Sequence, residues 1–262
     1  MALATAAQPA AAWKNGPPGN KVTNSTPDCL KPPYSTHDWI ADHGRAMLPA
    51  AEREWLDRHR TLYLIGTEAP DYAKIVTYCG APNRGYNDTG GGKHDLRFDI
   101  WGTVTRDTPA ARAEQEYAKA AEAFRAGNPG HAAYYLGAAV HYIGDLSQYG
   151  HTISGEAHHA DFELWVGAQT GSFVGGVFER YIKADGLQPV SAYNAVVNTG
   201  RRTWNGSAQI LKPDDMDSRF DPDAPADPKI VDSVGHSLNK SVNETADMLH
   251  GFYLAVVKPL AR

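Results

Sequence analysis

The spacing of apolar residues follows a helical period along most of the chain. Predicted helices cover residues 36–48, 51–66, 108–128, 129–149, 156–169, 189–204 and 229–257. Thr36 stands where the residue that caps the first of these helices is expected. No alternating run of apolar and polar residues is long enough to predict a strand. The pattern therefore predicts an all-α fold, with the helices packed in a single compact domain.

Two stretches between the predicted helices are long and polar. Residues 69–107 are rich in Gly, Asn and Asp and include the run GYNDTGGGKHD. Because long loops in compact domains are commonly functional, we expect an ordered loop here, over about 69–107. Residues 212–229 are acidic and broken by prolines. For positions 214–227 calcium binding stays open, and the absence of EF-hand spacing favours a solvated loop.

The predicted helix 129–149 carries two polar groups where a core helix would have apolar ones. It is apolar nearly all round, so it must be central. His141 and Asp145 are four residues apart and therefore project from one face of it. A buried carboxylate without a partner would cost several kcal/mol, so a partner is predicted. That partner is either the histidine itself, through a hydrogen bond, or a metal ion that binds both side chains.

The next predicted helix repeats the spacing. His159 and Glu163 are again four residues apart, and His151 lies in the connection between the two pairs. His158 is the alternative to His159, but Phe162 stands four residues after it, so His158 is interpreted as solvated or as an outer neighbour of the site. Five potential ligands within 23 residues favour a metal site over two separate structural pairs.

Size and charge restrict the function. A length of 262 residues with 42% hydrophobic content suits one domain with a substantial core. The net charge of -5 disfavours a role dominated by duplex nucleic acid. Runs of about 18 apolar residues are absent, so no transmembrane segment is predicted and any contact with a membrane would be peripheral. We expect a monomer.

Three features suggest a secreted protein. The start of the chain, through Ala12, is rich in small residues and resembles the cleavage end of a secretory signal. Five Asn-x-Ser/Thr sites predict a glycoprotein, at Asn24, Asn87, Asn205, Asn239 and Asn243. Cys29 and Cys79 are the only cysteines, and a disulfide between them is favoured over a free thiol or a metal pair.

The run HYIGDLSQYGH, followed by HHADFE, carries a family resemblance. It resembles the ligand core of the bacterial zinc-dependent phospholipases C, which are related in fold to fungal single-strand-specific nucleases that use three zinc ions. The shared pattern is His-x3-Asp-x5-His, and then His-x3-Glu in the phospholipases or His-x3-Asp in the nucleases. This chain has the Glu form.

The remaining ligands of that family pattern have candidates in the same order along the chain. His37 opens a predicted helix, Asp71 is followed by Tyr72, and His94 lies in the Gly-rich loop. Family members also begin, once processed, with a tryptophan whose amino group binds zinc, and Trp13 stands at that place. The resemblance thus implies a processing segment over residues 1–12 and one catalytic domain over 13–262.

The resemblance implies three zinc ions in a cleft to which the 69–107 loop contributes. Asp71, His94, His141 and Asp145 would hold the first, and Trp13, His37 and the bridging Asp145 the second. The third would be held by His151, His159 and Glu163.

The activity implied is that of a secreted phospholipase C, which uses a zinc-activated water to give diacylglycerol and a phosphorylated head group. Asp71 would orient or deprotonate that water, and Tyr72 either contacts the head group or packs. The Gly-Gly-Lys before His94 replaces the aromatic of choline-specific members. A nuclease acting on single-stranded DNA or RNA, and a member whose zinc is only structural, are the alternatives.

Overall fold

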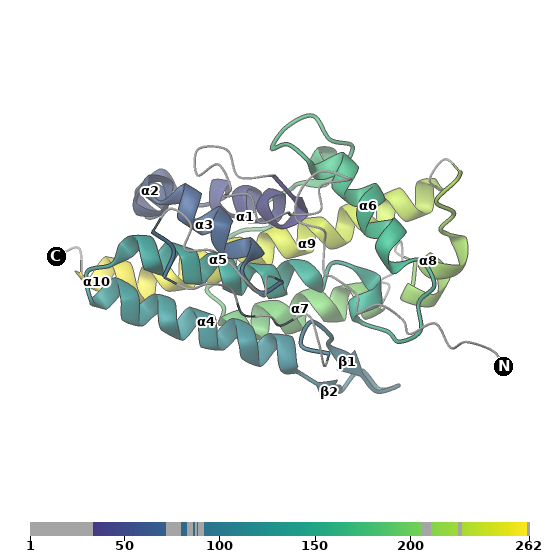
Figure 1. The fold of residues 1–262 in the computed structure, drawn as a ribbon, viewed down its shortest axis with the longest axis horizontal. Coiled ribbons are helices and arrows are strands. Elements are labelled where there is room, and N and C mark those ends of the chain that lie inside the picture. Colours follow the sequence, from purple (N-terminus) through teal and green to yellow (C-terminus); the bar gives the residue numbers. More distant parts are fainter. Residues whose placement is uncertain are drawn as a thin grey trace.

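Helix α5 (Pro129–Asp145) occupies the centre of the molecule (Figure 1). In the computed structural model, which describes residues 34–71, 80–82, 86, 88, 92–205, 211–224 and 227–260, it packs against α1, α3, α4, α7 and α9. Nearly every residue from Ala132 to its end is buried. The predicted central position of this apolar helix is therefore confirmed.

Helices make up most of the described chain, so the predicted all-α class is confirmed. Around α5 lie α1 (Thr36–Ala46), α2 (Ala50–Arg58), α3 (Arg60–Glu68), α4 (Thr108–Arg125), α6 (His159–Thr170), α7 (Ala192–Asn205), α8 (Pro213–Arg219) and α9 (Pro228–Phe252). A π-helical turn (Tyr253–Val257) joins α9 to α10 (Lys258–Leu260), and short 3-10 turns cover Tyr149–His151 and Glu179–Tyr181. No helix of the described residues is long and apolar enough to cross a membrane.

The cap of the first helix lies one residue before the predicted one, and the helix itself begins at Thr36. Ser35, not Thr36, caps α1: its hydroxyl oxygen accepts from the backbone N–H of Asp38, and the Asp38 carboxylate accepts from the backbone N–H of Ser35 at 2.9 Å. This reciprocal capping box needs an acceptor at the third helical position, which Asp38 supplies for Ser35. The cap fixes the start of α1 directly before His37.

Three segments differ from the sequence-based expectation. The predicted helix 51–66 is divided at His59, so that α2 and α3 are separate. The polar loop contains an antiparallel hairpin of β1 (Arg97–Phe98) and β2 (Val104–Arg106), whose strands are too short to produce an alternating pattern. The acidic stretch 212–229 contains α8, and in the described part of it no group of side chains is arranged to hold a metal ion.

Helices α3 and α5 cross at unusually close range because glycines face each other at the contact. A Cβ atom on Gly137 would lie 1.9 Å from the carbonyl oxygen of Tyr63, and one on Gly66 would lie 2.0 Å from the carbonyl oxygen of Tyr134. Both obstacles are backbone atoms, which cannot move aside as a flexible side chain can. The crossing therefore tolerates only glycine at these two positions.

Substituting Gly137→Ala is expected to destabilise the protein, because the added methyl group would push α3 away from α5. Overpacking of this kind costs about 1–3 kcal/mol or more, which thermal unfolding at a fixed zinc concentration would detect as a lowered midpoint. Gly167→Ala in α6 is the matched control, since the nearest atom to its Cβ would be 4.0 Å away. An unchanged midpoint for Gly137→Ala would contradict the close crossing.

Candidate metal centre

Asp145, the last residue of α5, lies among buried histidines. Its Oδ2 atom is 2.7 Å from Nδ1 of His94 and 3.3 Å from Nε2 of His141. Its other oxygen, Oδ1, is 3.4 Å from Nε2 of His37. The side chains of His37, His141 and Asp145 have no exposed surface. One carboxylate thus faces different imidazoles with its two oxygens.

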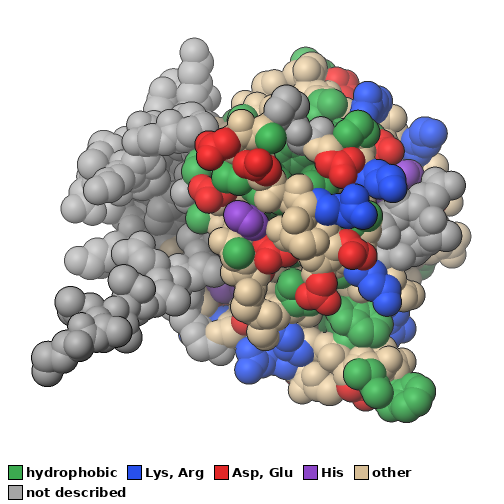
Figure 2. Space-filling model, turned by 90° about the vertical axis from the view of Figure 1, so that its right-hand side faces the viewer, with side chains coloured by type: hydrophobic (Ala, Val, Ile, Leu, Met, Phe, Trp, Pro, Cys, Tyr) green, Lys and Arg blue, Asp and Glu red, His purple; other side chains and the backbone are tan. Residues whose placement is uncertain are grey.

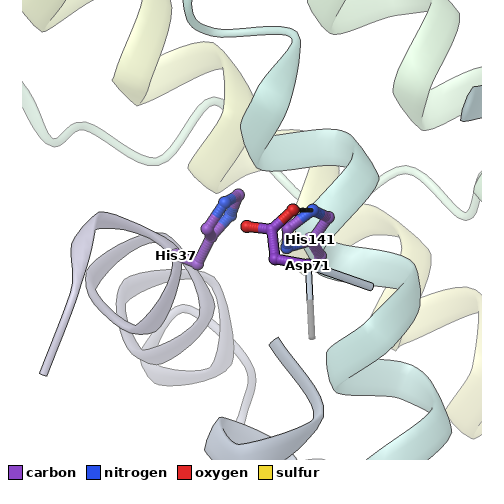
Figure 3. A group of neighbouring side chains, drawn as sticks. All are labelled: His37, Asp71 and His141. Carbon is purple, nitrogen blue, oxygen red and sulfur yellow. Dashed lines mark ion pairs between the residues drawn. The ribbon is translucent and has the colours of Figure 1, made fainter. Parts of the chain in front are cut away.

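Asp71, three residues after the end of α3, directs its carboxylate at the same histidines. Its Oδ1 atom is 3.6 Å from Nε2 of His141 and 3.7 Å from Nε2 of His94. The ring of His37 stacks on that of His141 with centroids 4.1 Å apart. Figure 3 shows His37, Asp71 and His141 converging from three separate segments. Ligand-type atoms of these three residues lie within 4.8 Å of one another, and those of His94, His141 and Asp145 do so as well.

A third group of ligand-type side chains is built from α6 and the turn after α5. Glu163 Oε1 is 2.9 Å from Nε2 of His159 and 3.9 Å from Nε2 of His151. His158 does not join this group, because its ring packs edge-on against Phe220. The structure thus brings together the three residues that the sequence pattern selected here.

The third group adjoins the other two. The ring centroids of His94 and His151 are 6.2 Å apart, so the three groups form one continuous cluster of side chains that extends from α1 through α5 to α6. Every predicted ligand within the described residues belongs to this cluster. The spacing of four residues explains the two carboxylate–histidine pairs, because it places both side chains on one helix face.

Three of the histidines have an oxygen partner on the nitrogen that points away from the cluster. Two of these contacts are hydrogen bonds, His141 Nδ1 with the carbonyl oxygen of Thr67 at 2.7 Å and His159 Nδ1 with Glu156 Oε1 at 2.7 Å. The third is a longer contact of 3.5 Å between His151 Nδ1 and Asp95 Oδ1. Such partners fix the ring orientation and leave the opposite nitrogen available to a metal. Sequence reasoning missed all three. Glu156 stands three residues before His159 and offered a signal, whereas a backbone carbonyl such as that of Thr67 leaves none.

Burial and neighbouring charge oppose each other in this cluster. Burial raises the pKa of Asp145, but His141 and His94 outweigh it and hold that pKa well below its ordinary range. Burial and the adjacent His141 lower the pKa of His37 far below its usual value, so that ring is neutral. On His94 burial lowers the pKa, but Asp145 reverses this and raises it to about 9. A dication bound here would displace the proton of His94.

The buried donor and acceptor atoms fit a metal better than they fit one another. Several lie close together without a hydrogen bond to any described group: His37 Nδ1 and Nε2, His94 Nε2, Asp145 Oδ1 and His151 Nε2. Each buried polar atom left without a hydrogen bond costs about 1–3 kcal/mol. Imidazole nitrogens and carboxylate oxygens are the ligands that zinc takes in catalytic sites, so the donor set suits zinc.

Several predicted features lie outside the described residues. They are the ligand Trp13, the head-group contact Tyr72, the cysteines Cys29 and Cys79, and the glycosylation sites Asn24 and Asn87. Of the described glycosylation sites, Asn205 is exposed. Asn243 is 3% exposed and donates to the carbonyl oxygens of Lys183 and Asn239. A glycan at Asn243 is therefore incompatible with this packing.

Comparisons with known proteins agree with the fold. No curated protein matches the chain. Among solved structures, the alpha toxin of Clostridium absonum is similar with a TM-score of 0.55 and 15% identity, over 84% of this chain and 63% of the toxin. The alpha-toxin of an avian strain of Clostridium perfringens is similar with a TM-score of 0.52 and 19% identity, over 85% and 64%. The chain thus spans less than two thirds of the length of either toxin, and at this identity the likeness shows the fold.

The family match covers the part of the chain that holds the described ligands. The model of the zinc dependent phospholipase C family matches residues 36–198, which run from the start of α1 into α7 and include His37, Asp71, Asp145 and Glu163. This region is more than half of the chain. The protein belongs to the zinc dependent phospholipase C family.

Proposed function

We propose that this protein is a secreted, monomeric phospholipase C that hydrolyses the phosphodiester bond on the glycerol side of phospholipids. Its products would be diacylglycerol and a phosphorylated head group. The family match and the donor set support a zinc-dependent phosphodiesterase. The single observation that carries the proposal is the pair of Asp145 contacts, one oxygen toward His37 and the other toward His94 and His141.

Three zinc ions are proposed for the cluster. Asp71, His94, His141 and Asp145 would hold the first, and His37 and Asp145, with the amino group of Trp13, the second. His151, His159 and Glu163 would hold the third. For Trp13 to take part, the bond between Ala12 and Trp13 must be cut, as expected of a processing segment over residues 1–12. The second ion therefore depends on processing, whereas the third does not.

Hydrolysis joins the oxygen of water to phosphorus and releases the glycerol oxygen, which takes up a proton. Bound zinc would bring the pKa of water toward neutrality and offset the negative charge of the phosphodiester. Asp71 is the residue proposed to orient that water and to accept its proton on a carboxylate oxygen. Its side chain is 10% exposed, whereas those of His141 and Asp145 are fully buried. Of these side chains, Asp71 is the one that a substrate can approach.

Two residues next to proposed ligands, Tyr72 and Lys93, bear on the choice of head group. Tyr72 directly follows Asp71 in the sequence and is proposed to contact the head group of the substrate. Lys93 is described in the structure and forms an ion pair of 2.9 Å with Asp88. Its side chain thus supplies a cation, not an aromatic ring, before His94. We propose no preference for choline.

Asp71→Asn is expected to lower the rate of phospholipid hydrolysis by about 10²–10⁴-fold, because an amide cannot accept the proton of the attacking water. The rates would be measured on phosphatidylcholine, other phospholipids and sphingomyelin, with bound zinc counted in the same samples. Asp161→Asn is the control, since Asp161 is exposed on α6 and should leave the rate unchanged.

The same panel should include single-stranded DNA and RNA. Full activity of Asp71→Asn would contradict the assigned role. Joint loss of zinc and helical content in that variant would give Asp71 a structural role instead. Release of nucleotides without any release of diacylglycerol would contradict the phospholipase proposal in favour of a nuclease.

Glu163→Gln is expected to remove one zinc ion from the correctly processed chain and to leave the other two. The substitution keeps the size of the buried side chain but removes the charge that offsets the third ion. Elemental analysis of the purified protein would count the zinc, and circular dichroism would confirm the retained helices. Asp161→Asn, on the same helix, should retain all the zinc of the wild type. An equal zinc content in Glu163→Gln and wild type would contradict the third site.

A further inference from the structure

The turn between β1 and β2 exposes two large apolar side chains. Ile100 is 84% and Trp101 is 85% exposed, the highest values among the large hydrophobic residues described. Figure 2 shows apolar side chains projecting at the lower edge of the molecule, the edge at which Figure 1 places the hairpin. Isolated exposed apolar residues are ordinary, but two adjacent ones at a projecting tip form a distinct feature.

The hairpin holds these side chains outward in an ordered turn. The Asp99 carboxylate accepts from the backbone N–H groups of Trp101 at 2.9 Å and Thr103 at 2.8 Å. Gly102 has a φ of 80°, a conformation that few other residues adopt, and a Cβ there would lie 3.4 Å from the ring of Trp204. The exposure of Ile100 and Trp101 therefore comes from a hydrogen-bonded turn.

The same hairpin is attached to the candidate metal centre. β1 begins three residues after His94. The backbone N–H of Leu96 donates to the carbonyl oxygen of His151 at 3.0 Å, and the guanidinium of Arg97 donates to the same oxygen at 2.6 Å. The hairpin is thus joined to two segments, each of which carries one proposed zinc ligand, His94 or His151.

Positive charge lies on α7, the helix whose Trp204 packs against the hairpin. Trp204 packs against Phe98 of β1 with ring centroids 5.0 Å apart. Arg201 stands one helical turn before Trp204, and Arg202 lines a shallow hollow with Arg201 and Lys240. Neither arginine forms an ion pair with a carboxylate of the described residues, whereas Arg97 and Arg106 both pair with Asp95. Arg201 and Arg202 are therefore available to bind anionic groups.

We propose that Ile100 and Trp101 insert into the surface of a phospholipid membrane, with Arg201 and Arg202 contacting lipid phosphates. Two side chains at a tip would bury much less surface area than the roughly 800 Å² per partner that a stable protein–protein interface buries. Tryptophan favours the membrane–water boundary, and unpaired arginines attract anionic lipid. The purpose of this surface, delivery of lipid to the metal centre, rests on the proposed phospholipase activity, but the binding itself does not.

Sedimentation with sucrose-loaded vesicles tests the surface without any measurement of hydrolysis. The double variant Ile100→Ser/Trp101→Ser is expected to bind phosphatidylcholine–phosphatidylglycerol vesicles at least roughly tenfold more weakly than wild type, because it loses the apolar insertion. Arg201→Gln/Arg202→Gln should weaken binding several-fold to these vesicles and not to vesicles of phosphatidylcholine alone. Leu260→Ser is the matched control, since Leu260 is 56% exposed on α10.

Two further measurements separate this inference from the proposed function. Hydrolysis of a short-chain phospholipid below its micelle concentration should be equal in wild type and Ile100→Ser/Trp101→Ser, which also confirms that the variant is folded. If wild type binds vesicles but hydrolyses no phospholipid, the proposed phospholipase activity is refuted and the proposed membrane-binding surface is supported. The proposed membrane-binding surface would be refuted by any of three results. These are no vesicle binding by wild type, equal binding by the double variant, or an effect of the double variant on self-association alone.

Discussion

The close contact between α3 and α5 determines where the metal centre can form. Gly66 and Gly137 let the two backbones approach until a Cβ would collide with a carbonyl oxygen. At this separation the carbonyl of Thr67 accepts from Nδ1 of His141, so one helix fixes the ring of the other. The end of α3 then places Asp71 opposite His141. Small residues at a crossing thus set the geometry of ligands one turn away.

The second constraint is charge. Asp145 and Glu163 are buried carboxylates, and buried imidazole nitrogens that make no hydrogen bond to a described group lie close to them. Such an arrangement is expensive unless cations share the space, because desolvation of each ion costs several kcal/mol. The proposed zinc ions relieve this cost, and the outer partners Glu156 and Asp95 hold the rings in place for them. Folding and metal binding are therefore expected to be coupled.

Sequence reasoning predicted the part of the site that a helix period encodes. The spacing of four residues identified His141 with Asp145 and His159 with Glu163, and the apolar surroundings predicted the central α5. Segments governed by local hydrogen bonds were less predictable: the cap at Ser35 depends on the reciprocal bond with Asp38, and the hairpin depends on the carboxylate of Asp99. His37, Asp71 and His94 came from a family resemblance, since only the tertiary fold brings residues so distant in sequence together. Trp13 and Tyr72 stay predictions.

The most direct measurement is a crystal structure of the processed, zinc-loaded chain with diffraction recorded on both sides of the zinc absorption edge. Three anomalous peaks are expected: one among Asp71, His94, His141 and Asp145, one beside His37 and Asp145, and one among His151, His159 and Glu163. A peak on each side of Asp145 would establish its bridging role. A single peak, or peaks away from these side chains, would contradict a three-zinc centre bridged by Asp145.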